Sequence, residues 1–103
     1  MRKALLLSLA ALASCDRYQD TFTVSDPSGL AKSAVLQLDG NDQPLERDGK
    51  RFSTARRIGR DADGRIHVVY ADGRTVDCPI GYVTPGAAQR WNFRLTSLRC
   101  EPI

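Results

Sequence analysis

The stretch that decides the fold is RIHVVYADGRTVDCPI, residues 65–80. Apolar residues recur at every second position on both sides of a central Ala-Asp-Gly segment: Ile66, Val68, Tyr70, Val76, Cys78 and Ile80. A period of two puts alternate side chains on opposite faces of an extended chain, which is the pattern of half-buried β-strands. Asp and Gly are residues that close tight turns. We therefore expect two strands joined by a hairpin turn, with one face of each in a hydrophobic core.

The same alternation extends in both directions from this hairpin, and no helical period persists beyond residue 15. Further runs are DTFTVS (20–25), AVLQLD (34–39), RFSTARRI (51–58) and RWNFRLT (90–96). Turn-forming segments separate the runs: DPSG (26–29), DGND (39–42), RDGK (47–50) and DADG (61–64). Strands at such short spacing are typical of an all-β sandwich or a small barrel. We predict an all-β fold, a small antiparallel β-sandwich of about seven strands.

Two irregular regions stand near the C-terminus. Trp91 and Leu95 occupy odd positions, whereas Leu98 and Cys100 occupy even ones. If both pairs face inward, a β-bulge near Thr96–Ser97 must shift the phase of the last strand. The segment TPGAAQR (84–90) is the longest non-strand stretch, and we expect a loop or a single helical turn there.

The first 15 residues, MRKALLLSLAALASC, have the layout of a bacterial export signal. Two basic residues precede nine mostly apolar ones, Ala4 to Leu12, too few for the roughly 20 residues that span a membrane. The closing LASC resembles the lipobox of bacterial lipoproteins. This resemblance implies a signal peptide at 1–14, lipid attached to Cys15, a short tether at 15–21 and one domain at 22–103. An ordinary signal peptide that happens to contain a cysteine is the alternative.

The residue after the lipobox cysteine bears on the membrane that holds the protein. It is Asp16. In lipoproteins of enteric bacteria an aspartate at this position marks retention at the inner membrane. The resemblance therefore implies an inner-membrane protein that faces the periplasm.

Charge in the mature chain is balanced overall but uneven along it. Removing Arg2 and Lys3 leaves 13 basic and 12 acidic residues, a formal charge of +1, which gives no support to a nucleic-acid partner. Residues 47–65 nevertheless carry seven basic side chains: Arg47, Lys50, Arg51, Arg56, Arg57, Arg60 and Arg65. They are either solvated strand faces and turns or one basic face toward anionic lipid headgroups or another polyanion.

With Cys15 assigned to lipid, Cys78 and Cys100 remain as an even pair in an oxidising compartment. We expect a disulfide between them, worth about 3 kcal/mol in the chain-entropy model. A metal site is the alternative, but two distant cysteines and the single His67 do not supply a tetrahedral set of ligands.

We find no recognisable catalytic constellation and expect no enzyme activity, cofactor or metal. His67 alternates with Ile66 and Val68, which predicts an outward side chain. The DADG segment lacks the first and last ligands of an EF-hand loop, and a hairpin turn explains it better. Tyr82 is either an exposed recognition residue beside a rigid loop or a core residue with its hydroxyl at the rim, and we expect Trp91 in the core.

A second resemblance concerns the domain. VSDPSGLAKSAVLQL (24–38) followed by LERDGKRFS (45–53) is similar to the carboxypeptidase regulatory-like, transthyretin-type β-sandwich. The resemblance lies in Val24, Asp26 and Gly29, and more loosely in Gly49 and Phe52. It implies a seven-stranded Greek-key sandwich without catalytic machinery.

Together these features predict a lipid-anchored envelope protein that binds or supports another envelope component close to the same membrane. The alternative function is a small protein inhibitor of a cell-wall-lytic or other hydrolase.

Overall fold

A computed structural model describes residues 19–103 of the chain. The predicted signal peptide at 1–14, the lipid attachment at Cys15 and the sorting residue Asp16 lie outside the described residues. The predicted domain start, residue 22, falls inside them. The first strand begins two residues earlier, at Asp20.

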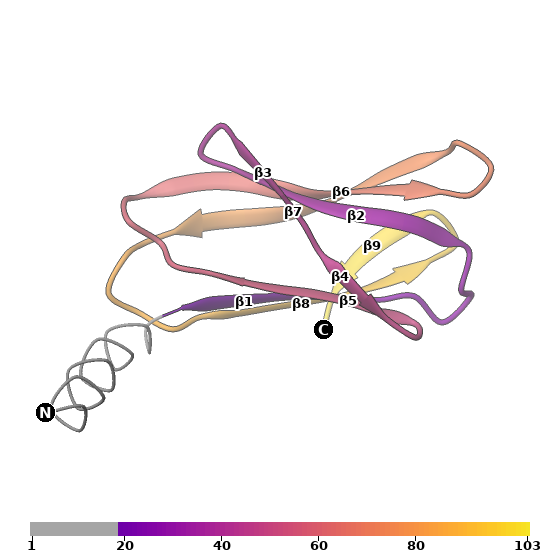
Figure 1. The fold of residues 1–103 in the computed structure, drawn as a ribbon, viewed down its shortest axis with the longest axis horizontal. Coiled ribbons are helices and arrows are strands. Elements are labelled where there is room, and N and C mark those ends of the chain that lie inside the picture. The colour runs from indigo at the N-terminus through magenta and orange to yellow at the C-terminus, as the bar shows by residue number, and fades with distance from the viewer. Residues whose placement is uncertain (1–18) are drawn as a thin grey trace, which may run out of the picture.

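Within residues 19–103, nine strands form two sheets that face each other (Figure 1). The five-stranded sheet has the order β4 (Glu46–Asp48), β5 (Arg51–Arg56), β1 (Asp20–Ser25), β8 (Arg90–Thr96) and β9 (Arg99–Pro102). The four-stranded sheet has the order β3 (Asn41–Pro44), β2 (Ala31–Leu38), β6 (Ala62–Tyr70) and β7 (Thr75–Val83). The predicted all-β sandwich is confirmed. Neighbouring strands are antiparallel except β1 and β8, which pair in parallel.

No alternating run of the sequence marks strands β3 and β4. Both lie at sheet edges and are mostly exposed, so neither face selects apolar residues and no alternation marks them. A single residue, the buried Leu45, separates β3 from β4 in the chain. At Leu45 the chain passes from one sheet to the other (Figure 1). This crossing closes one side of the sandwich.

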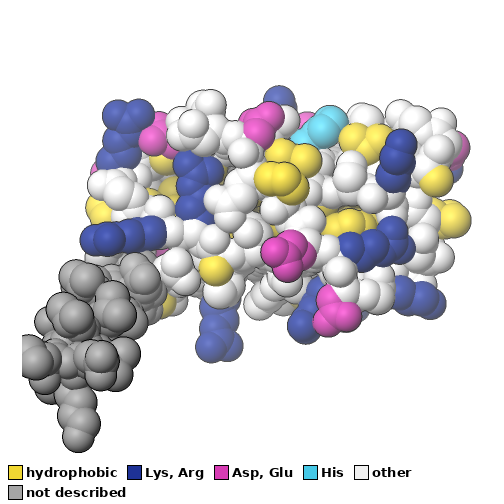
Figure 2. Space-filling model, viewed as in Figure 1, with side chains coloured by type: hydrophobic (Ala, Val, Ile, Leu, Met, Phe, Trp, Pro, Cys, Tyr) yellow, Lys and Arg dark blue, Asp and Glu magenta, His cyan; other side chains and the backbone are white. Residues whose placement is uncertain are grey.

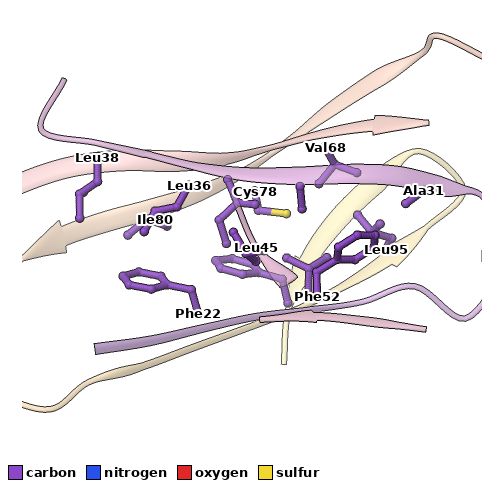
Figure 3. Close-up of a cluster of buried hydrophobic side chains, with 14 of the residues drawn as sticks. Phe22, Ala31, Leu36, Leu38, Leu45, Phe52, Val68, Cys78, Ile80 and Leu95 are labelled. Atoms are coloured by element: carbon purple, nitrogen blue, oxygen red, sulfur yellow. The ribbon is translucent and has the colours of Figure 1, made fainter. Parts of the chain in front are cut away.

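The core fills the space between the sheets and follows the alternation of the strands. Phe22 and Val24 on one sheet, and Leu36, Ile66 and Val68 on the other, have no exposed surface. Figure 3 shows side chains from both sheets pointing into the shared interior. Burying one such side chain stabilises the fold by about 1.5–3 kcal/mol, so this interior is what holds the sheets together.

The predicted disulfide is confirmed. The Cys78 and Cys100 sulfurs are 2.01 Å apart, with a sequence separation of 22 residues. The bond joins β7 to β9, the two edges opposite the β3–β4 crossing. One side of the sandwich is therefore closed by the chain and the other by a covalent bond.

The change of phase near Thr96 has a different cause from the predicted bulge. A two-residue turn separates two strands, β8 and β9, and both turn residues have a positive φ: 45° at Ser97 and 64° at Leu98. This φ region is unusual for residues other than glycine and asparagine. The segment 84–89 is a loop with turn geometry.

The DADG segment is also not a hairpin turn. Gly64 lies inside β6, next to a register shift between Ala62 and Gly64. A Cβ atom at Gly64 would clash with the backbone carbonyl oxygen of Gln37 on β2. Glycine is required here by close approach of two strands.

The connections gather at the two ends of the sandwich (Figure 1). The N-terminal end holds the start of β1, the β2–β3 turn, the β5–β6 connection (57–61) and the β7–β8 loop (84–89). The far end holds the β1–β2 connection (26–30) and the turns at 49–50, 71–74 and 97–98.

Candidate functional site

The basic segment 47–65 does not form one face. Strand β5 runs from Arg51 at the far end to Arg56 at the N-terminal end, and its six residues span about 17 Å at 3.3 Å per step. Arg47 and Lys50 lie with Arg51 at the far end, whereas Arg57 and Arg60 follow Arg56 at the N-terminal end. Lys and Arg side chains accordingly occur toward both ends in Figure 2. The structure does not bring the seven predicted residues together.

At the far end, Arg47 is bound to the protein's own backbone. Its guanidinium donates to the carbonyl oxygens of Ala31 at 2.9 Å and Gly49 at 3.0 Å, and more weakly to Gly29 at 3.4 Å. It also lies over the ring of Phe52, 5.2 Å from the centroid, within the range of a cation–π interaction. Arg47 therefore ties the β1–β2 connection to the β4–β5 turn and has a structural role.

The DPSG turn at the same end is organised by a buried carboxylate, Asp26. Its oxygens accept hydrogen bonds from the Ser28 hydroxyl at 2.7 Å and the Ala31 backbone N–H at 2.8 Å. Its own backbone N–H donates to the carbonyl of Lys50 at 2.8 Å. These bonds satisfy the turn internally, as a buried polar group requires.

At the N-terminal end, Arg60 forms a two-bond ion pair with Asp39. Its Nε and Nη2 donate to the two carboxylate oxygens at 2.8 and 2.9 Å. The hydrogen bond from Arg60 lowers the pKa of Asp39 below its ordinary value, and the charge of Arg56 contributes in the same direction. The pair joins the β2–β3 turn to the β5–β6 connection across the N-terminal end.

A hollow of about 310 Å³ lies between these two connections, and we call it the arginine hollow. Four of the residues lining it are charged, namely Asp39, Arg56, Arg57 and Arg60, so their formal charge is +3 − 1 = +2. Arg56 is half-buried, and its Nη1 atom is shielded from solvent without a hydrogen-bond partner in the part of the chain that the structure describes. The Arg56 side chain thus lines the hollow while one of its nitrogens has no acceptor among residues 19–103.

Asp20 is a residue that the sequence analysis passed over. It is fully buried at the start of β1, where its carboxylate accepts the Gln89 backbone N–H at 3.1 Å and the Trp91 indole N–H at 3.2 Å. The sequence does indicate that Asp20 is buried, because Asp20 occupies the same alternate positions as the inward-facing Phe22 and Val24. Asp20 fixes the beginning of the domain to the β7–β8 loop.

Arg65 lies apart from both groups, on the outer face of the four-stranded sheet. Its guanidinium donates to the Gln37 side-chain oxygen at 2.9 Å and contacts Asp77 at 3.4 Å. Asp77 is also 2.7 Å from Nδ1 of His67, whose side chain is about one-third exposed. This is a cross-strand polar network on an open face, and such exposed pairs contribute about 0–1 kcal/mol.

The two aromatic residues singled out earlier differ in exposure. The Tyr82 residue is 65% exposed, and its hydroxyl donates to Asp61 at 3.1 Å. That hydrogen bond raises the pKa of Tyr82. Trp91 is half-buried and packs against the core. Of the two interpretations of Tyr82, the structure matches the exposed one.

The sheet edges are poorly suited to pairing with another chain. Pro44, Pro79 and Pro102 lie in β3, β7 and β9, and the fourth edge strand, β4, is a charged three-residue strand. Proline lacks the N–H that a strand ladder needs, and short charged edges resist pairing. A binding site is therefore expected at an end or on a face.

Comparison with protein-family models, curated proteins and solved structures finds no match to this chain. Between residues 19 and 103 there is no group of three or more side chains placed to hold a metal ion. The same residues contain no helix long and apolar enough to cross a membrane. The functional conclusion rests on the residues of this chain.

Proposed function

We propose that the protein is a lipid-anchored component of the bacterial cell envelope, held by Cys15 and facing the periplasm. The LASC lipobox supports the anchor, and the disulfide fits an oxidising compartment. In this role the domain is a non-enzymatic binding or structural module. Its closed sandwich, with the core packed between two sheets, supports a binding role on the outer surface.

The observation that carries this proposal is the position of Asp20. Five residue steps separate Cys15 from Asp20, which is about 17 Å when fully extended. Asp20 is buried and hydrogen-bonded, so the domain offers no slack after it. A lipid on Cys15 would therefore hold the N-terminal end of the sandwich against the membrane. The partner that this module binds lies in or on the same membrane, which is the inner membrane if Asp16 acts as a retention signal.

The far end supports a second candidate function, inhibition of a cell-wall-lytic or other hydrolase. Leu30 and Leu98 are 59% and 37% exposed there, and Leu98 stands on a turn whose two residues have positive φ. The backbone of Leu30 is also held, because its carbonyl accepts the Ala71 N–H at 3.0 Å. Apolar side chains on a preorganised turn lose little entropy on entering a cleft.

The anchor is tested by the variant Cys15→Ser, with Ser14→Ala as its matched control because it keeps a small residue before the cysteine. We expect Cys15→Ser to leave an unprocessed or soluble protein that takes up no labelled fatty acid, while Ser14→Ala is processed like the wild type. Unchanged labelling and membrane fractionation of Cys15→Ser would contradict the proposal.

The inhibitor function is tested separately, by capture of a soluble hydrolase and loss of its activity. Leu98→Asp should abolish that inhibition. If the wild type inhibits no cell-wall-lytic hydrolase, this second candidate fails and the first is unaffected.

A further inference from the structure

Among residues 19–103, the charged side chain of Arg56 has no bonded partner. Two carboxylates are related to it: Asp20 is its cross-strand neighbour, and Asp39 has a pKa that the charge of Arg56 helps to lower. The oxygens of Asp20 accept from Gln89 and Trp91, and those of Asp39 accept from Arg60. Within residues 19–103, Arg56 forms no ion pair of its own.

An unsatisfied buried donor is costly, and more so when it is charged. A ligand, an ion or an ordered water can complete the hydrogen bonds of such a group. The arginine hollow has the remaining features of an anion site. Its lining has a formal charge of +2, or +1 when the carboxylate of Asp20, the cross-strand neighbour of Arg56, is also counted. The buried apolar residues Leu38 and Ile58 line it as well. A guanidinium presents paired N–H donors that match the oxygens of a phosphate group.

The place of the hollow in the molecule indicates which phosphate it meets. It is lined by residues of the β2–β3 turn and the β5–β6 connection. These two connections lie at the same end of the sandwich as the start of β1 (Figure 1). With about 17 Å of chain between Asp20 and Cys15, that end lies within reach of lipid headgroups. Arg47, Lys50 and Arg51, by contrast, lie at the opposite end of the sandwich.

General attraction to an anionic surface does not explain the site. A second hollow lies across the β2–β3 turn and is lined by Asp39, Asp42, Asp63 and Arg65, with a formal charge of 1 − 3 = −2. The N-terminal end is thus divided into a basic and an acidic part. A membrane contact here depends on the local geometry of the basic part.

From these observations we propose that the arginine hollow binds the phosphate group of an anionic phospholipid, with Arg56 as the central donor. This inference rests on the proposed membrane attachment and adds an orientation to it. The lipid on Cys15 holds the domain at the membrane, and the phosphate contact fixes which side of the N-terminal end turns toward the surface.

The test uses the full lipidated protein in nanodiscs of phosphatidylcholine alone or mixed with phosphatidylglycerol. The readout is the NMR shift of the Arg56 Nε–H and the Gly59 backbone amide. We expect both to shift as the phosphatidylglycerol fraction rises. Inorganic phosphate added to phosphatidylcholine nanodiscs forms a third arm, which separates a lipid phosphate from a soluble one.

Gly59 offers a variant that leaves the fold intact. Its φ is not in the left-handed region and a Cβ there would meet no atom within 4 Å, so Gly59→Asp adds a carboxylate to the hollow without a clash. This variant should need an about tenfold higher phosphatidylglycerol fraction for the same Arg56 shift, the effect of losing one charge-assisted hydrogen bond. The matched control Gly59→Ala should behave like the wild type, and so should Arg51→Met at the far end.

Three results would overturn the inference: no response to phosphatidylglycerol, an unchanged response in Gly59→Asp, or a response to inorganic phosphate alone. The last would assign the hollow to a soluble anion. The mass of the N-terminal peptide from the same preparation reports on the anchor independently. A chain without lipid on Cys15 would refute the proposed function. In that case, binding of the protein to vesicles of the same two compositions would still show whether the arginine hollow binds anionic phospholipid.

Discussion

The two ends of the sandwich each hold three cations of the basic segment, but these cations have different surroundings. The far-end cations (Arg47, Lys50 and Arg51) surround turns whose polar groups are satisfied within the chain, with Arg47 bound to three backbone carbonyls. The N-terminal-end arginines (Arg56, Arg57 and Arg60) surround a hollow in which one guanidinium nitrogen has no acceptor among residues 19–103. A run of arginines in a sequence therefore does not define a binding surface. What separates a structural arginine from a ligand-binding one is whether the fold supplies its acceptors.

The largest expected effect on stability comes from removal of the disulfide. Removing the disulfide with the double variant Cys78→Ala and Cys100→Ala should lower the free energy of unfolding by about 3 kcal/mol, because the unfolded chain regains the freedom of a closed loop. Chemical denaturation measures this loss. The bond joins β7 to β9, away from both groups of cations, so the phosphatidylglycerol response should survive under conditions where the variant is folded. Loss of the phosphatidylglycerol response in the folded variant would show that the arginine hollow depends on the disulfide.

The next effect concerns the far end alone. Arg47→Met keeps an unbranched side chain over Phe52 but loses the hydrogen bonds to Ala31 and Gly49, and we expect it to destabilise the fold by about 1.5 kcal/mol. Urea denaturation checks the value, with Arg51→Met as the exposed control, which should change stability by less than about 0.5 kcal/mol. Equal changes of stability in Arg47→Met and Arg51→Met would contradict a structural role of Arg47.

Arg56→Met should give the opposite result. The substitution removes a partly buried charge that has no direct partner in the described part of the chain, and we expect stability within about 0.5 kcal/mol of the wild type or slightly above it. The phosphatidylglycerol response should disappear. A loss of stability as large as that of Arg47→Met would show that Arg56 serves the fold, and the contrast between the two ends would fail.

The smallest effect is a pH dependence at the N-terminal end. The pKa of Asp39 is lowered in the folded protein, chiefly by the hydrogen bond from Arg60. Its contribution to stability is therefore present above the ordinary pKa of an aspartate and is lost as the pH falls through the lowered value. The variant Asp39→Asn should show a flatter decline of stability in acid than the wild type, measured by thermal unfolding between neutral and strongly acidic pH. Parallel curves of stability against pH for the variant and the wild type would show that Asp39 does not contribute to the pH dependence.

The strands with one buried face were predictable, because burial imposes the alternation seen at Ile66, Val68 and Cys78. The edge strands β3 and β4 were not, since solvent on both faces leaves no periodic signal. The turn at Ser97–Leu98 was read as a bulge because neither residue is typical of positive φ.

The candidate site was predictable only in part. The arginines were identified, but their grouping was not, although an extended RFSTAR run already places Arg51 and Arg56 about 17 Å apart. A buried aspartate such as Asp20 was overlooked because polarity normally indicates exposure. Which arginine lacks an acceptor depends on the packing of loops distant in sequence, and no local pattern contains it.

The most direct test of the account is the orientation of the domain at the membrane. The lipidated protein would be placed in nanodiscs whose lipids carry a spin label at the headgroup, and the relaxation of backbone amides measured by NMR. We predict the strongest enhancement at residues 38–41 and 57–61 of the N-terminal end, and the weakest at the far-end turns 49–50 and 97–98. Strongest enhancement at the far end, or equal enhancement at both ends, would contradict a sandwich seated on its membrane by the arginine hollow.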